Sequence, residues 1–241
     1  NFFIGFSEFQ FILQIRSCIS GYLIQESYKN LNYDRIQTFY SKTNEITKPK
    51  KMQMDEFIEL RTIGIGSQSK ATLFYHILDG KLVIIKIPYV YNSEKYVDRE
   101  INNYQKIKNP FIPKFYGTVY YEKQTCPIIE YINGKLLKDA KIYKYSKTDK
   151  ITILIQLLSI IEDFHKNHLI YRDLKPNNVI IDKNKNIVVI DYDQMIEDNT
   201  YNEESDEQQT VDFSSVYHAP EINSKNITNK VDIFSFGKII E

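Results

Sequence analysis

The sequence predicts an α+β protein in which a small β-rich part is followed by a mainly helical part. Short apolar runs of β type, separated by turn residues, occupy residues 54–134. A polar stretch at residues 41–53, which includes Pro49, precedes them and has the composition of a linker. Residues 148–168 instead carry an apolar stripe with the helical period, formed by Ile151, Leu154, Leu158, Ile161 and Phe164.

The composition limits the possible classes of function. With 241 residues, of which 42% are hydrophobic and 14% aromatic, the chain can form a substantial core. Lys plus Arg equals Asp plus Glu at 31 each, so no net field attracts nucleic acid, and no nucleic-acid partner is expected. Cys18 and Cys126 are too far apart in sequence to indicate a disulfide framework or a zinc site, and they favour reduced thiols in a cytoplasmic protein.

The first 24 residues are strongly apolar, but Glu8 and Arg16 interrupt them, so we expect no transmembrane segment. They lack the basic start of a signal peptide. Their apolar residues recur at helical spacing, at Phe2, Phe6, Phe9 and Leu13. An amphipathic helix is expected, either packed against the core or lying on a membrane surface. Residues 1–53 are therefore predicted to form a separate region of unknown role.

Five strands are expected in the β-rich part, at residues 59–63, 72–78, 81–87, 115–122 and 127–132. Asp79-Gly80 predicts a tight turn between the second and the third. One helix is expected after Ser93, a potential N-cap, with Glu100 on its apolar face. A carboxylate on such a face needs a partner, and Lys86 at the end of the buried run VIIK is a candidate.

Polar residues gather around two short strands in the second part. The octapeptide YRDLKPNN, residues 171–178, precedes apolar runs at 179–181 and 187–190, and Asp191 follows the second run. Any one of these polar residues alone would be an ordinary turn residue. Together they fit phosphoryl transfer, in which one Asp receives a hydroxyl proton, a Lys neutralises phosphate, and an Asn and a second Asp hold Mg²⁺.

The order of the motifs GIGSQS, VIIK, Glu100, IIEYING, YRDLKPNN, DYD, HAPE and DIFSFG resembles the eukaryotic protein kinase family, from about residue 55 to residue 241. This resemblance implies a bilobal protein-kinase-like fold. Residues 54–134 would form a five-stranded antiparallel β lobe with one helix and the hinge. Residues 135–241 would form a mainly helical, incomplete C-terminal lobe.

The resemblance also implies a site for ATP and Mg²⁺. Asp173 would be the catalytic base and Lys175 the contact to the γ-phosphate, while Asn178 and Asp191 would be the metal ligands. Lys86 would hold the α- and β-phosphates, positioned by Glu100. The remaining nucleotide-binding residues implied by the resemblance are Ile63, Gly64, Gly66, Ser69, Ala71, Ile84, Ile129, Glu130, Ile132 and Ile180.

The implied activity is phosphorylation of Ser or Thr hydroxyls in protein substrates, because Lys175 follows Asp173 by two residues as in serine/threonine kinases. Residues 194–216 contain no Lys or Arg and many acidic residues. By the resemblance, Thr210 would be phosphorylated by an upstream kinase or by autophosphorylation, with Arg172 receiving the phosphate. The alternative for this segment is a solvated loop. Asp232 would begin a helix that anchors the catalytic residues.

Several positions depart from the family pattern, namely Ser69 for glycine, Ile84 for alanine, Tyr171 for histidine, Tyr192 for phenylalanine and Asp193 for glycine. Both tyrosines are still expected to stack with Tyr104 and Phe115 in a column that links the lobes. The sequence stops four residues after Gly237, so the lobe is expected to be truncated and Glu221 to lack its family arginine. The alternative function is a pseudokinase, a catalytically impaired nucleotide-binding or scaffold module.

Overall fold

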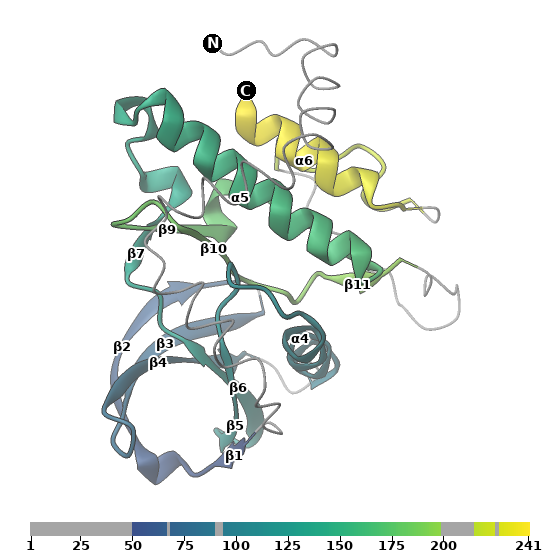
Figure 1. Ribbon diagram of the computed structural model, residues 1–241. Coiled ribbons are helices and arrows are strands. Elements are labelled where there is room, and N and C mark those ends of the chain that lie inside the picture. The colour runs from purple at the N-terminus through teal and green to yellow at the C-terminus, as the bar shows by residue number, and fades with distance from the viewer. Residues whose placement is uncertain (1–49, 67, 90–93, 199–214, 225–226) are drawn as a thin grey trace.

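The structure is a computed structural model of the chain, and it describes residues 50–66, 68–89, 94–198, 215–224 and 227–241. The predicted N-terminal helix, Ser93 and Thr210 lie outside the described residues. Within them the fold is α+β, with a strongly curled sheet and the helix α4 in one part and the helices α5 and α6 in the other (Figure 1). The predicted fold class is confirmed.

The main sheet has six strands in the order β1-β5-β6-β4-β3-β2. Each expected strand is present, and hairpin connections make the pairs β2 with β3, β3 with β4 and β5 with β6 antiparallel. The strands are β1 (Lys50–Met52), β2 (Phe57–Ile65), β3 (Ser69–His76), β4 (Lys81–Pro88), β5 (Phe115–Tyr121) and β6 (Gln124–Glu130). A short 3₁₀ helix, η1 (Met54–Glu56), joins β1 to β2.

The strand β1 corrects the prediction of five antiparallel strands, because it is a sixth strand, pairs in parallel with β5 and lies in the predicted linker. Its backbone lies against Gly117, whose φ is +142°. A Cβ atom at Gly117 would lie 2.0 Å from the carbonyl oxygen of Lys50, so only glycine permits this approach. Met52 at the end of β1 is buried in the sheet interior. A three-residue strand is too short to have a readable period.

The strand β4 is buried on both faces, which is why its sequence is almost continuously apolar. Val83, Ile85 and Ile87 point into the core enclosed by the curled sheet, together with Phe74 and Ile128. Ile84 belongs to the second core, which extends into the other part of the molecule. Lys86 shares that second face, because side chains alternate along a strand. The alternation therefore directs Lys86 toward the junction of the two parts.

The helix α4 (Glu94–Lys106) packs beside β6 and buries Val97, Glu100, Ile101 and Tyr104, as the spacing predicted. The helix α5 (Lys147–Lys166) begins at the N-cap Ser146, whose hydroxyl accepts from the Asp149 backbone N–H at 3.1 Å. The helix α6 (Lys230–Ile240) lies alongside α5 (Figure 1).

Short elements connect these helices and form two small sheets, in the orders β10-β9-β7 and β11-β8. Their strands are β7 (Gly134–Leu136), β8 (Leu169–Ile170), β9 (Val179–Asp182), β10 (Ile187–Val189) and β11 (Ile196–Glu197). The 3₁₀ helices are η3 (Leu137–Asp139), η4 (Ile142–Lys144) and η5 (Pro176–Asn178). The pair β9 and β10 is antiparallel and lies between α5 and the main sheet (Figure 1).

A column of aromatic rings links the two parts of the molecule, as predicted. Tyr104 stacks on Phe115 at a centroid distance of 5.8 Å and meets Tyr192 edge to face at 4.9 Å. Tyr192 in turn contacts Tyr171 at 5.7 Å. Phe164 from α5 joins both of these tyrosines, a contact that the sequence analysis did not predict. These rings form one packed cluster between the sheet part and α5.

The two unusual tyrosines have partners for their buried hydroxyl groups. The Tyr171 hydroxyl donates to the carbonyl of Ile190 at 2.5 Å, and the Tyr192 hydroxyl donates to the carbonyl of Val189 at 2.6 Å. Each hydroxyl thus satisfies a carbonyl at the end of β10, so the replacement of histidine and phenylalanine leaves no unpaired polar group at these positions.

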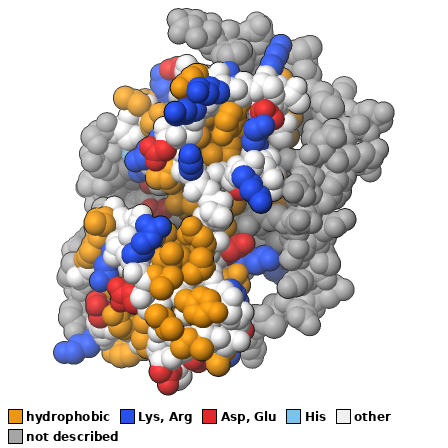
Figure 2. Space-filling view, turned by 90° about the vertical axis from the view of Figure 1, so that its left-hand side faces the viewer, with side chains coloured by type: hydrophobic (Ala, Val, Ile, Leu, Met, Phe, Trp, Pro, Cys, Tyr) orange, Lys and Arg blue, Asp and Glu red, His pale blue; other side chains and the backbone are white. Residues whose placement is uncertain are grey.

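The outer face of β2, β3 and β4 exposes apolar side chains, and Figure 2 shows them gathered on the sheet part of the molecule. Ile58, Tyr75 and Leu82 are cross-strand neighbours in this patch. Among the helices in the described ranges, none combines the length and the apolar character that a membrane span requires.

Candidate active site

Lys86 is the centre of an ion-pair network at the junction of the sheet and the helical part. Its Nζ atom donates to Glu100 Oε1 at 2.5 Å and to Asp191 Oδ1 at 2.8 Å. Burial alone would lower the pKa of Lys86, but the charges of Asp191 and Glu100 outweigh it and raise the pKa above its usual value. Lys86 is therefore a fixed cation, and the predicted pairing with Glu100 is present.

The 171–178 loop is held by the carboxylate of Asp232, which is fully buried in the first turn of α6. Asp232 Oδ2 accepts from the Tyr171 backbone N–H at 2.9 Å, and Oδ1 accepts from that of Arg172 at 2.8 Å. His165 from α5 also contacts Oδ2, at 2.9 Å. Arg172 has a φ of +70°, which costs energy in a residue other than glycine. The anchoring by Asp232 supports this strained backbone.

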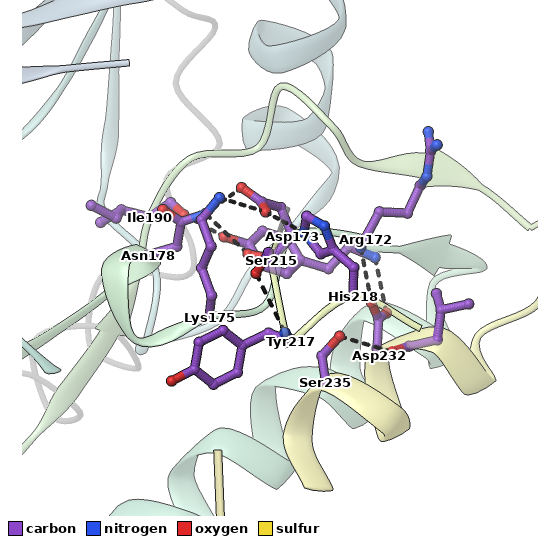
Figure 3. Close-up of polar contacts among 12 residues, drawn as sticks. Arg172, Asp173, Lys175, Asn178, Ile190, Ser215, Tyr217, His218, Asp232 and Ser235 are labelled. Carbon is purple, nitrogen blue, oxygen red and sulfur yellow. Dashed lines mark hydrogen bonds and ion pairs between the residues drawn. The ribbon is translucent and has the colours of Figure 1, made fainter. Parts of the chain in front are cut away.

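Asp173, the predicted base, is surrounded by hydrogen-bond donors (Figure 3). Lys175 Nζ contacts its Oδ1 at 2.7 Å. Asn178 Nδ2 donates to its Oδ2 at 2.6 Å and to its backbone carbonyl at 3.0 Å. His218 Nε2 lies 3.0 Å from Oδ1. The predicted residues Asp173, Lys175 and Asn178 are thus brought together.

Asn178 and Asp191, the predicted metal ligands, are connected through Ile190. The backbone N–H of Ile190 donates to the carbonyl of Asn178 at 2.9 Å, so the residue before Asp191 is bonded to Asn178 (Figure 3). The Asn178 amide nitrogen faces Asp173, which leaves the amide oxygen as a ligand on the opposite side. An amide oxygen and a carboxylate fit Mg²⁺, which usually takes one or two protein ligands and completes its shell with water and phosphate.

The predicted nucleotide-binding residues lie mainly along β2, β3, β4 and β6. Gly64 pairs with Ala71, and the Gly66 N–H donates to the Ser69 carbonyl at 2.9 Å in the turn between β2 and β3. Ile84 and Ile129 are cross-strand partners in the buried face beside Lys86. These positions line one continuous side of the sheet.

Four further predicted residues frame this side. Ile63 is 42% exposed on β2. Glu130 ends β6, and its backbone N–H donates to the Lys114 carbonyl at 2.8 Å. Ile132 follows in the connection to β7 and accepts from the Gly134 N–H at 3.0 Å. Ile180 on β9 lies against Gly134 of the neighbouring strand β7, in the small sheet that follows this connection.

Asp193, at the position of the family glycine, lies close to this network. Burial raises its pKa to about 7, the negative charge of Asp191 adds to the rise, and Lys86 opposes it. Three contact residues were not identified from the sequence. His165 has no motif around it, and the HAPE motif that begins with His218 does not indicate a contact with Asp173. Asn103 of α4 donates to the carbonyls of Tyr192 and Met195 at 3.0 and 3.3 Å.

Comparison with known proteins agrees with this geometry. The family described as protein kinase domain matches residues 57–241. The carbon catabolite-derepressing protein kinases of Candida glabrata and Saccharomyces cerevisiae are each 27% identical over 191 residues, which is 75% of this chain. The cAMP-dependent protein kinase type 3 of Saccharomyces cerevisiae is 29% identical over 202 residues, or 79% of the chain. The chain belongs to the protein kinase family.

The aligned region spans 30% and 29% of the two carbon catabolite-derepressing kinases and 48% of the cAMP-dependent kinase. The chain therefore spans less than half of the length of each of these curated relatives.

Proposed function

We propose that the protein is a protein kinase that transfers the γ-phosphate of ATP to Ser or Thr hydroxyls of protein substrates, with Mg²⁺ as cofactor. The observation that carries this proposal is the continuous set of contacts from Glu100 through Lys86 to Asp191, and from Asn178 to Asp173. A cation for phosphate, oxygen ligands for a metal and a carboxylate for a hydroxyl proton then lie in one site.

The roles follow from the charges and positions of these groups. Lys86 would exchange its contact with Asp191 for the α- and β-phosphates, while Glu100 keeps it in place. The backbone carbonyl of Glu130 and the N–H of Ile132 would bind the adenine edge. Asn178 and Asp191 would hold Mg²⁺, which would supply positive charge that offsets the negative charge of the phosphates.

Transfer begins when the substrate hydroxyl donates its hydrogen bond to the Asp173 carboxylate. The hydroxyl oxygen attacks the γ-phosphorus in line with the bond to the β-γ bridging oxygen, that bond breaks, and ADP leaves with its electron pair. The hydroxyl proton passes to Asp173. Lys175, 2.7 Å from Asp173 Oδ1, neutralises charge on the transferred group.

Ser or Thr is proposed as the phosphate acceptor because Lys175 follows Asp173 by two residues, as in serine/threonine kinases. The names of the three relatives support this choice of acceptor only in a general way. We also propose that Thr210 is phosphorylated by an upstream kinase or by the protein itself. The comparisons give no support to the pseudokinase alternative.

The experiment is transfer of labelled γ-phosphate from Mg-ATP to a mixture of peptides that contain Ser, Thr or Tyr, with the unsubstituted protein and with Asp173→Asn. Transfer to Ser or Thr peptides, lowered by at least about a hundredfold in the variant, is expected. Asp139→Asn, an exposed carboxylate of η3, is the matched control and should behave as the unsubstituted protein. ATP binding without any transfer would contradict the proposed activity and favour the pseudokinase.

A further inference from the structure

His218 is a histidine with a buried side chain that contacts the predicted base, a contact that the HAPE motif does not indicate. Its Nε2 atom lies 3.0 Å from Asp173 Oδ1, and only 4% of its side chain is exposed (Figure 3). The two residues are 45 positions apart in the sequence, so this contact depends on tertiary structure. An ionised carboxylate only accepts hydrogen bonds, so His218 is the donor in this contact.

The donors around Asp173 occupy most of its acceptor capacity. A carboxylate offers about four lone-pair positions, two on each oxygen. In the described residues Lys175 and His218 take Oδ1, and Asn178 takes one position on Oδ2. These contacts fix the rotation of the carboxylate and leave a position on Oδ2. A substrate hydroxyl that reaches Asp173 therefore meets an oriented acceptor.

The segment that carries His218 is itself anchored. Ala219 and Ile222 are fully buried in a small core with Ile170 of β8 and Val231 of α6. The His218 backbone N–H also donates to the Ser215 carbonyl at 3.1 Å. The imidazole is thus attached to a packed backbone segment. The position of this segment determines where the imidazole contacts Asp173.

We propose that His218 is a positioning residue for phosphoryl transfer, which holds the Asp173 carboxylate in the orientation that receives the substrate hydroxyl. This role rests on the proposed kinase function. It makes the base dependent on the packing of residues 215–222 against β8 and α6. His218 itself does not contact the reacting atoms, so its loss should slow transfer without weakening the binding of ATP.

The test compares His218→Phe, which keeps the ring shape without a donor, with His218→Gln, whose amide N–H reaches the place of Nε2. Loss of one hydrogen bond to a charged group should lower kcat by about tenfold or more in the Phe variant. The KM for ATP and the thermal shift with Mg-ATP should be unchanged. The Gln variant should recover most of the lost kcat, to within about threefold of the unsubstituted protein.

Each other outcome overturns the proposal. Equal kcat in all three proteins would mean that the contact does not affect the base, and a higher kcat in the Phe variant would mean that His218 blocks the substrate. Loss of Mg-ATP binding together with kcat would make His218 a residue of general structural importance. These outcomes leave the proposed function intact if Asp173→Asn is inactive. Absence of transfer by the unsubstituted protein would instead overturn the proposed function, and this role with it.

Discussion

Among the positions that depart from the family pattern, Asp193 has the most specific expected effect on stability, because its carboxyl group is largely buried beside the negative charge of Asp191. Its pKa rises from an ordinary value of 3.8 to about 7. A carboxyl with a raised folded-state pKa binds its proton more tightly in the folded protein than in the unfolded chain. Its contribution to stability is therefore fully present below about pH 4 and is lost as the pH rises through about pH 7.

The rise corresponds to about 4 kcal/mol, since each pKa unit represents about 1.4 kcal/mol. About 2.5 kcal/mol of it would be lost between pH 5 and pH 8. Asp193→Asn is nearly isosteric and cannot ionise. The difference in free energy of unfolding between the variant and the unsubstituted protein should therefore shift in favour of the variant by up to about 2.5 kcal/mol from pH 5 to pH 8.

Urea denaturation without nucleotide or metal, at pH 5 and pH 8, measures this difference. All other ionisable groups are common to both proteins, so the comparison isolates the group at position 193. Asp98→Asn, an exposed carboxylate on α4, is the control and should give the same small difference at both pH values. A difference between Asp193→Asn and the unsubstituted protein that does not change with pH would refute the assignment of a raised pKa to Asp193.

Three further substitutions test the fold around the site. Gly117→Ala should lower the free energy of unfolding by about 1–3 kcal/mol, because a Cβ atom would meet the Lys50 backbone. Gly237→Ala in α6 should instead raise the free energy of unfolding by about 0.5–1 kcal/mol, because a Cβ atom there meets nothing within 4 Å. Urea denaturation of both variants decides this, and equal effects would contradict the close approach of β1. Asp232→Asn should cost about 2–4 kcal/mol and slow phosphate transfer, because an amide nitrogen cannot accept from the Arg172 backbone. Full stability of this variant would contradict the anchoring role.

Much of the fold was predictable because its elements have local signals. The strands are short apolar runs bounded by turn residues, α5 has a clear helical stripe, and Glu100 and Lys86 each stood out as a charge in an apolar pattern. Their pairing followed because neither charge is easily buried alone. The placement of Asn178 and Asp191 came from the order of motifs rather than from any local period.

The remaining features depend on residues that are distant in sequence. The strand β1 requires Gly117, which no pattern within residues 50–52 indicates. Phe164 was predicted as part of a helical stripe, but its contact with the aromatic column depends on how α5 packs. His218 reaches Asp173 across 45 residues of sequence, from a segment in which Ala219 is buried with Ile170 of β8. Contacts of this kind need the tertiary structure.

The most direct test of the account is the binding of ATP with and without Mg²⁺, measured by calorimetry for the unsubstituted protein and for Asp191→Asn. The network of Lys86, Asn178 and Asp191 predicts binding that is strengthened by Mg²⁺, with this strengthening reduced by at least about tenfold in the variant. Binding that does not respond to Mg²⁺, or that responds equally in both proteins, would contradict a shared site for the triphosphate and its cation.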